Sequence, residues 1–581
     1  MFILNFKYLK QFILISLISL SLVLIVVYIT DITELIIPEY KYCQSKGSIL
    51  HKFIFSYIFD FKSTLSFFFR LSVSDVAMPY NLTLLMIRIS VFYNKFIFFI
   101  MFAILLIILV NIFIATTNNN TINMPLIMTF TFLTLLNVLF ICLFSILNLP
   151  NCVLQTNYFI SYNSWTLNLI LIIVILFSLL IISSQPAIRK TKLNFFEYYI
   201  LLLTIFLGCI ILIGSTNLLI SYLSLELISI TSYIILLINS PSIYSIEATL
   251  KYFILGSIAS IIFLFGLCNI YFITGTLNLN LISLLLSNNF PISTYYLILL
   301  NISFICFFLT FSFKFALVPF YFWIIDIFDT TKSFLIAFLT IIPKIAYLSF
   351  FLILIYKIFI CILPIIQNYI LVSIIISSII GIFGALKQIR FKRLLAYSTI
   401  FHSSLLFISI FGGTNLNLWS SIFFFSIYIF TTFLIWIVLF ILELSFKNKT
   451  VLNWKHLSNL INTNKSLSFI FSILILSLAG LPPFIGFFSK FFIFLFLINK
   501  SNFLFITIIC GLLSIIGLIY YLKFIKLIVI EQNYINLITS KSTKINYFIL
   551  SLGFISFCWL HVDFVLVLKL IDLLTNYFNF Y

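Results

Sequence analysis

Long apolar runs, separated by short polar connections, cover most of this chain of 581 residues. Most runs hold about 20 residues, the length that an α-helix needs to cross a hydrocarbon core about 30 Å thick. Backbone polar groups find no water in that core, so a spanning segment must be a helix or part of a closed barrel. Barrel strands alternate apolar and polar residues over about 10 positions, and these runs do not alternate. The pattern therefore predicts an all-α polytopic membrane protein.

About fourteen core transmembrane helices follow from the pattern, preceded by one extra N-terminal helix near residues 11–29. The core spans lie at about 96–115, 126–149, 166–184, 197–214, 217–239, 245–273, 295–328, 333–356, 364–386, 394–413, 418–442, 466–499, 503–527 and 546–570. Two of them, 295–328 and 466–499, are too long for one straight crossing and contain internal prolines. We expect both to be broken helices, because proline interrupts the helical hydrogen-bond ladder.

Two domains are expected from this arrangement. Residues 1–94 form an N-terminal extension with one membrane anchor and an interfacial or peripheral segment, and residues 95–581 form the membrane domain. A cleaved signal peptide is the alternative for the first helix. Its apolar length suits an anchor better, and no small-residue cleavage site follows it.

Charge and composition narrow the class of function. Hydrophobic residues make up 63% of the chain and charged residues 8%, against about 25% charged residues in soluble domains. The net charge of +18 does not indicate nucleic acid, because most Lys and Arg lie in connections on one side of the membrane. That distribution is the topology signal of a multi-pass protein. The connection after the ninth span, for example, is expected to hold Lys387, Arg390, Lys392 and Arg393.

Motifs for cofactors are absent from the sequence. The nine cysteines form no C-x-x-C pair, which argues against zinc and iron–sulfur sites. No G-x-G-x-x-G or Walker-type loop is present, so nucleotide and flavin chemistry would lie in other proteins. We expect no cofactor and no metal in this chain.

Ionisable side chains inside apolar runs are the candidate functional residues. Glu226 lies in LLISYLSLELISITSYIILL, and Lys314, Lys344 and Lys490 each have apolar residues on both sides. A charge near the bilayer centre costs several kcal/mol unless it is paired, and such residues commonly serve ion pathways. Burial disfavours an ammonium group and a nearby carboxylate favours it, so a lysine in this setting can exchange a proton. Lys251 is more ambiguous, because an i, i+4 surface pair with Glu247 and a relay role are both open.

Prolines inside spans strengthen this interpretation. Pro319, Pro343, Pro482 and Pro483 each lie within eight residues of Lys314, Lys344 or Lys490. Unwound backbone at membrane depth is tolerated where it faces protein or a wet cavity. Broken helices beside ionisable groups are typical of midplane ion sites in transporters.

Four other polar residues have less specific surroundings. His402 lies on an otherwise apolar helix, where a hydrogen-bonded packing role and a proton-relay role are both open. Asp326 and Asp329 are expected to mark the wet end of the span that holds Lys314. Glu443 ends its span before a basic connection and is expected to be solvated.

Six segments carry a resemblance to a known family: YLSLELISITSYIILL, EATLKYFILGSIAS, FKFALVPFYFW, IPKIAYL, KRLLAYSTIFHSSLL and LAGLPPFIGFFSKF. In this order, between about residues 165 and 525, they resemble NADH–ubiquinone oxidoreductase chain 2, an antiporter-like membrane subunit of respiratory complex I. The resemblance implies two inverted five-helix repeats, at about 197–356 and 364–527. It also implies a multi-pass protein of the mitochondrial inner membrane.

The resemblance implies roles for individual residues as well. Glu226 corresponds to a carboxylate paired with Lys314, Lys344 to a connecting lysine, and Lys490 to a lysine nearer one exit, while Lys251 and His402 match family positions. Quinone reduction elsewhere in the complex would drive protons through this chain. FMN, iron–sulfur clusters and ubiquinone are expected in other subunits. The implied partners are other membrane-arm subunits, including antiporter-like paralogues, and membrane lipids such as cardiolipin.

The sequence departs from the family pattern in two places, and two other functions stay open. Tyr321 stands where relatives often have histidine, and the segment IIDIFDTTKS lacks the Pro and Gly that relatives commonly place there. One alternative is a subunit of an Mrp-type cation/proton antiporter, which would move cations without NADH oxidation. The other is a membrane scaffold that keeps the fold without transport.

Overall fold

The computed structural model describes residues 195–238, 242–287, 294–359, 362–413, 415–445, 465–498 and 503–529. The expected extension over 1–94 and the expected spans 96–115, 126–149, 166–184 and 546–570 lie outside the described residues. Within the described ranges the regular structure is helical, apart from one isolated antiparallel bridge between Asn217 and Asn278.

Ten of the expected spans coincide with described helices to within a few residues. The first five consist of α7 (Phe195–Gly214), α8 (Leu218–Ile238), α9 (Ile243–Thr274), α11 (Thr294–Phe315) with α12 (Phe322–Thr330), and α13 (Ser333–Leu354). The short helix α10 (Leu279–Ser287) precedes α11, and the π-helix η2 (Ile355–Phe359) continues α13. The second five consist of α14 (Leu363–Leu386), α15 (Phe391–Phe411), α16 (Asn415–Ser445), α19 (Lys465–Ala479) with α20 (Ile485–Ile498), and α21 (Leu504–Val529).

Helix α9 shows how local sequence sets the ends of a long helix. Ser242 accepts a hydrogen bond from the backbone N–H of Ser245, and the Ser245 hydroxyl lies within hydrogen-bond distance of the Ser242 N–H. This reciprocal capping satisfies backbone donors that the first turn would leave free. At the other end Gly275 adopts a left-handed conformation with φ of 66°, which glycine permits without a side-chain clash.

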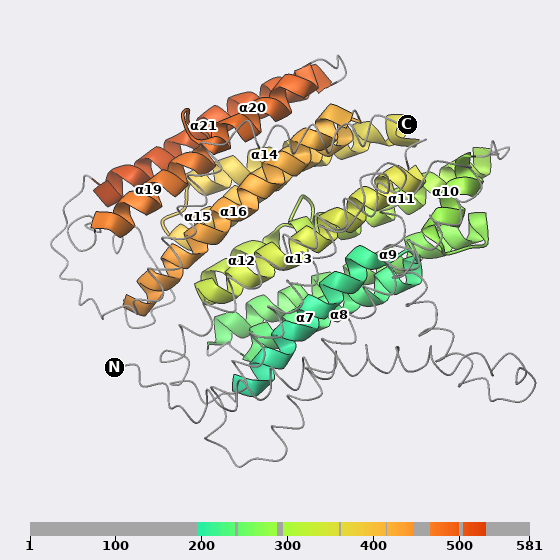
Figure 1. The fold of residues 1–581 in the computed structure, drawn as a ribbon, viewed down its shortest axis with the longest axis horizontal. Coiled ribbons are helices and arrows are strands. Elements are labelled where there is room, and N and C mark those ends of the chain that lie inside the picture. Colours follow the sequence, from blue (N-terminus) through green and yellow to red (C-terminus); the bar gives the residue numbers. More distant parts are fainter. Residues whose placement is uncertain are drawn as a thin grey trace, which may run out of the picture. The chain divides into compact units, whose positions relative to one another are not determined.

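Two helices lie at the centre of the described bundle. In their most apolar stretches 89% of the residues are buried in α13 and 94% in α15, against 33% in α9 and 39% in α21. Helix α13 packs against α7 and α16, and α15 packs against α14 and α16 (Figure 1). The outward faces of α9 and α21 carry exposed apolar side chains such as Phe265 and Phe505. These faces suit lipid, because apolar side chains there need no protein cover.

Seven described helices are long and apolar enough to cross a membrane by length and composition, and four further apolar helices are shorter. The shorter ones include α19 and α20, the two halves of one interrupted span. The described chain is therefore an all-helical, multi-pass membrane protein.

Candidate functional site

The first helix break separates α11 from α12. Helix α11 ends at Phe315, Ala316 takes a left-handed φ of 59°, and α12 begins at Phe322. The structure places Pro319 in this connection. Trp323 of α12 reaches back and donates from Nε1 to the Phe313 carbonyl at 3.0 Å. The break thus satisfies one carbonyl at the end of α11 with a side chain from beyond the break.

A small cavity beside this break brings Glu226 and Lys314 together. Helices α8, α9 and α11 line it with Tyr222, Leu225, Glu226, Ser229, Ala259, Ser260, Phe263, Thr310, Phe311 and Lys314. Its volume of about 20 Å³ has room for about one water molecule. Both Glu226 and Lys314 are only partly buried.

The pair of Glu226 and Lys314 does not form a direct ion pair within 4.0 Å in the described structure, although their charges interact. The Ser229 hydroxyl donates to the Glu226 carboxylate at 3.3 Å. The Lys314 ammonium lies 5.3 Å from the centre of the Tyr347 ring, a cation–π distance. The structure therefore gives these two residues a shared cavity with separate neighbours, so a proton passing between them needs an intervening molecule or a side-chain movement.

Lys344 lies deep in α13, directly after Pro343, and is 4% exposed. Its ammonium has no hydrogen-bond or ion-pair partner among the residues that the structure describes. An ammonium without a carboxylate in such a place is costly. The apolar neighbours on both sides of Lys344 in the sequence predicted this burial.

His402 lies on α15 and interacts electrostatically with two lysines. Its ring is buried and lies within electrostatic range of both Lys490 and Lys344. The Nε2 atom is 3.4 Å from the Tyr521 hydroxyl, and the buried Nδ1 has no described hydrogen-bond partner. A purely structural role does not account for the Nδ1 atom without a partner, because buried polar atoms are normally hydrogen-bonded. The structure thus gives the His402 ring one hydrogen-bond contact, at Nε2, and leaves Nδ1 without a described partner.

Lys490 lies in α20, and its side chain reaches back to the second helix break, between α19 and α20. Helix α19 ends at Ala479, the connection contains Pro482 and Pro483, and α20 begins at Ile485. The Lys490 residue is 8% exposed. Its ammonium donates to the Leu478 and Ala479 carbonyls at 2.8 Å each. Its positive charge thus lies at the negative end of the α19 dipole.

Lys251 lies outside this buried set. Half of its side chain is exposed, and it pairs with Glu247 at 2.8 Å and with Asp326 of α12 at 3.1 Å. Exposed pairs of this kind contribute about 0–1 kcal/mol. We expect Lys251→Gln to change the free energy of unfolding by less than about 1 kcal/mol. Thermal unfolding of the intact protein measures this change, and a loss several times larger would contradict the surface-pair interpretation.

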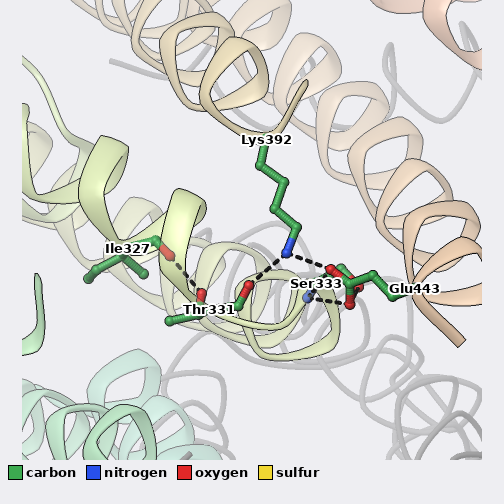
Figure 2. Close-up of polar contacts among 5 residues, drawn as sticks. All are labelled: Ile327, Thr331, Ser333, Lys392 and Glu443. Carbon is green, nitrogen blue, oxygen red and sulfur yellow. Dashed lines mark hydrogen bonds and ion pairs between the residues drawn. The ribbon is translucent and has the colours of Figure 1, made fainter. Parts of the chain in front are cut away.

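Two expectations about acidic span ends were wrong. Glu443 is 5% exposed and forms an ion pair with Lys392, which was expected in an open connection (Figure 2). Asp329 is 7% exposed and forms ion pairs with Arg390 and Arg393. The cause is tertiary: the start of α15 and the end of α16 pack over the α12–α13 junction and exclude solvent from it.

Lys332 lies in that junction. Burial lowers the pKa of Lys332, and the negative charge of Glu443 partly opposes this. The sequence carried only a weak signal for these buried ion pairs. A basic cluster and a carboxylate lie at the ends of spans that share one side of the membrane. In the described ranges no group of three or more His, Cys, Asp or Glu side chains could hold a metal ion.

The described chain is an antiporter-like, multi-pass membrane protein. Its central helices, its two helix breaks with a lysine beside each, and its buried ionisable side chains define this class. Residues 215–517 match the family described as NADH:quinone oxidoreductase/Mrp antiporter, transmembrane. The match covers more than half of the chain, and the chain belongs to this family.

Relatives and solved structures agree with this assignment. NADH-quinone oxidoreductase subunit N of Pelagibacter ubique is 31% identical over 349 residues, covering 60% of this chain and 72% of the relative. Subunit N of Bartonella bacilliformis is 31% identical over 358 residues, covering 61% of this chain and 72% of the relative.

A chain of respiratory complex I from Thermus thermophilus is similar in fold, with a TM-score of 0.64 and 20% identity over 81% of this chain and 98% of that chain. A chain of the Mrp complex from Dietzia has a TM-score of 0.59 and 16% identity over 71% and 83%, respectively. At these identities the two structures establish the fold alone.

Proposed function

We propose that this chain is the proton-translocating, antiporter-like subunit of a respiratory complex I and corresponds to NADH–ubiquinone oxidoreductase chain 2. Family membership and the likeness to bacterial subunit N proteins support the proposal. The observation that carries it is the buried set of Lys344, His402 and Lys490, none of which has a carboxylate partner among the described residues. Buried cations are costly unless they are paired, and proton transfer explains why the protein keeps them.

In the proposed mechanism, quinone reduction in another subunit changes the charge or position of Glu226 or Lys314. The cavity between them could hold one water and so carry a proton between the two side chains. Lys344, His402 and Lys490 then form the onward row, because His402 interacts electrostatically with both lysines. Moving one charge against 100 mV requires about 2.3 kcal/mol, which modest changes in the surroundings of a buried lysine can supply. Lys251 stays a proposed contributor at the exposed end, beside Asp326.

The proposal extends to architecture and partners. The five-span groups around α7–α13 and α14–α21 are proposed as inverted repeats, each with one broken helix. The chain would lie in the mitochondrial inner membrane against other membrane-arm subunits, including antiporter-like paralogues, and against lipids such as cardiolipin. FMN, iron–sulfur clusters and ubiquinone would be bound by other subunits, with no cofactor in this chain.

Lys344→Met tests the proposed function directly. In the intact complex in sealed membrane vesicles, we expect proton pumping per NADH oxidised to fall about tenfold or more, because a methionine cannot carry a proton. Methionine is similar in length and apolar, so the α13 packing should be kept. The measurement is NADH-driven quenching of a pH-sensitive dye, normalised to quinone reduction.

Lys465→Met is the matched control, because Lys465 is exposed at the start of α19. It should pump like the unmodified complex. Full pumping by Lys344→Met, with assembly intact, would defeat the proposal and point to a scaffold role.

An Mrp-type antiporter subunit is the second candidate, because the matching family and one similar structure include Mrp proteins. Native-gel isolation followed by mass spectrometry separates the two. Co-migration with NADH- and quinone-binding subunits supports the first proposal. Cation/proton exchange by a smaller assembly without NADH oxidation would support the second.

A further inference from the structure

A buried ion pair outside the proposed proton row joins two helices to the α12–α13 junction. Lys392, in the first turn of α15, lies 2.5 Å from the carboxylate of Glu443 near the end of α16 (Figure 2). Both side chains are almost fully buried. Breaking such a pair by removing one partner is strongly destabilising, because the other charge is left without compensation.

The remaining hydrogen bonds of the pair go to both sides of the junction. The Glu443 carboxylate accepts from the Ser333 backbone N–H at 3.1 Å and from the Ser333 hydroxyl at 2.7 Å. The Lys392 ammonium donates to the Thr331 carbonyl at 2.7 Å. Ser333 is the first residue of α13 and Thr331 is the C-cap of α12. Figure 2 shows the two charged side chains meeting beside Ser333 from two different helices.

The signs of the two charges match the two helix ends. A carboxylate at a helix N-terminus and a cation at a C-terminus are each favourable with respect to the helix dipole. Lys332, the N-cap residue of α13, supplies no side-chain hydrogen bond to cap the helix. Glu443 therefore caps α13 from a position 110 residues away in the sequence.

A second set of ion pairs holds the same junction. Asp329, near the end of α12, pairs with Arg390 and with Arg393, the latter at 2.9 Å. The start of α15 thus contacts the end of α12 through two arginines and Lys392, and Glu443 of α16 links Lys392 to the start of α13. We call the Lys392–Glu443 pair, with its hydrogen bonds to Thr331 and Ser333, the junction clamp.

The junction clamp is aligned with Lys344 along α13. Eleven residues separate Ser333 from Lys344, and at about 100° per residue they lie within about 20° on the same face of the helix. The rise between them is about 16 Å. Because α13 is one continuous helix from Ser333 to Leu354, a shift of its first turn would be passed along the helix to Lys344.

The junction clamp differs from the proton row in how its polar atoms are used. Lys344 and the Nδ1 of His402 have no described partners, whereas Lys392 and Glu443 each have a charged partner and a helix-end partner. A relay group must exchange partners, and this pair is held on two sides. We propose that Lys392 and Glu443 are positioning residues that hold α13, and through it Lys344, in place for proton transfer. This inference rests on the proposed function.

Two variants of the intact complex test it. Glu443→Gln keeps an acceptor for Ser333 but leaves the buried Lys392 charge without a carboxylate to compensate it. We expect backbone hydrogen exchange over residues 333–340 to rise about tenfold, with a loss of pumping per NADH. Lys392→Met combined with Glu443→Gln removes both charges and keeps the acceptor. The double variant also lacks the donor to the Thr331 carbonyl, so we expect its exchange and pumping to return most of the way, to within about threefold of the unmodified complex.

Each result decides between a positioning pair and the other roles. Recovery of both readouts in the double variant supports the junction clamp. If the double variant recovers slow exchange but not pumping, the Lys392–Glu443 pair itself carries protons. If Glu443→Gln leaves exchange unchanged, the pair does not hold α13. Either result overturns the proposal. Pumping that survives Lys344→Met would instead defeat the proposed function. In that case, hydrogen exchange alone would decide whether Lys392 and Glu443 hold α13.

Discussion

Replacing Lys490 with arginine should leave the complex assembled and able to reduce quinone, yet lower proton pumping per NADH about tenfold or more. Arginine can still donate to the Leu478 and Ala479 carbonyls that Lys490 binds, so the end of α19 keeps its cap. A guanidinium does not lose its proton in proteins, so the group can no longer pass one on. Dye quenching normalised to quinone reduction, with a native gel for assembly, measures both effects.

Lys490→Met, compared with Lys490→Arg, separates the two tasks of this side chain. It removes the proton-carrying group and also the donor for two helix-end carbonyls, so assembly as well as pumping should fall. Lys465→Arg, at the exposed start of α19, is the control and should behave as the unmodified protein. Normal pumping by Lys490→Arg would show that Lys490 is only a helix cap.

The lysines beside the two helix breaks make different contacts, so the two five-span groups do not place their lysines in the same way. At the first break the Phe313 carbonyl is satisfied by Trp323, and the Lys314 ammonium lies near the cavity that Glu226 also lines. At the second break no tryptophan is present between Gly480 and Ile485, and Lys490 itself binds the exposed carbonyls. Lys314 is therefore placed to respond to a carboxylate, whereas Lys490 must release two carbonyls before it can change partner.

The sequence predicted the features that depend on local pattern. Span length and internal proline indicated the interruptions that the structure places after Phe315 and after Ala479. Apolar neighbours on both sides indicated the burial of Lys344 and Lys490. Both inferences work because the membrane imposes one solvent along the whole span, so depth can be read from position in an apolar run.

Features that depend on neighbouring helices were not predictable in this way. Position at a span end indicated solvent for Glu443 and Asp329, but the helix ends that cover them come from segments 51 and 61 residues away, at Lys392 and Arg390. The separation of Glu226 and Lys314 by a cavity also depends on how α8, α9 and α11 pack. Spacing along one chain carries no information about such lateral distances.

The second break should also be sensitive to a single added methyl group. A Cβ on Gly486 would overlap the Ser477 carbonyl oxygen, and backbone on both sides leaves little room to move. We expect Gly486→Ala to lower the free energy of unfolding by about 3 kcal/mol or more, at the upper end of overpacking costs. The melting temperature of the intact complex, with native-gel yield, measures the loss.

Gly511→Ala on α21 is the matched control, because its Cβ would meet no atom within 4 Å. It should change stability by no more than about 1 kcal/mol. If both variants melt alike, the close contact across the break does not exist, and the position of the Lys490 ammonium at the end of α19 loses its structural basis.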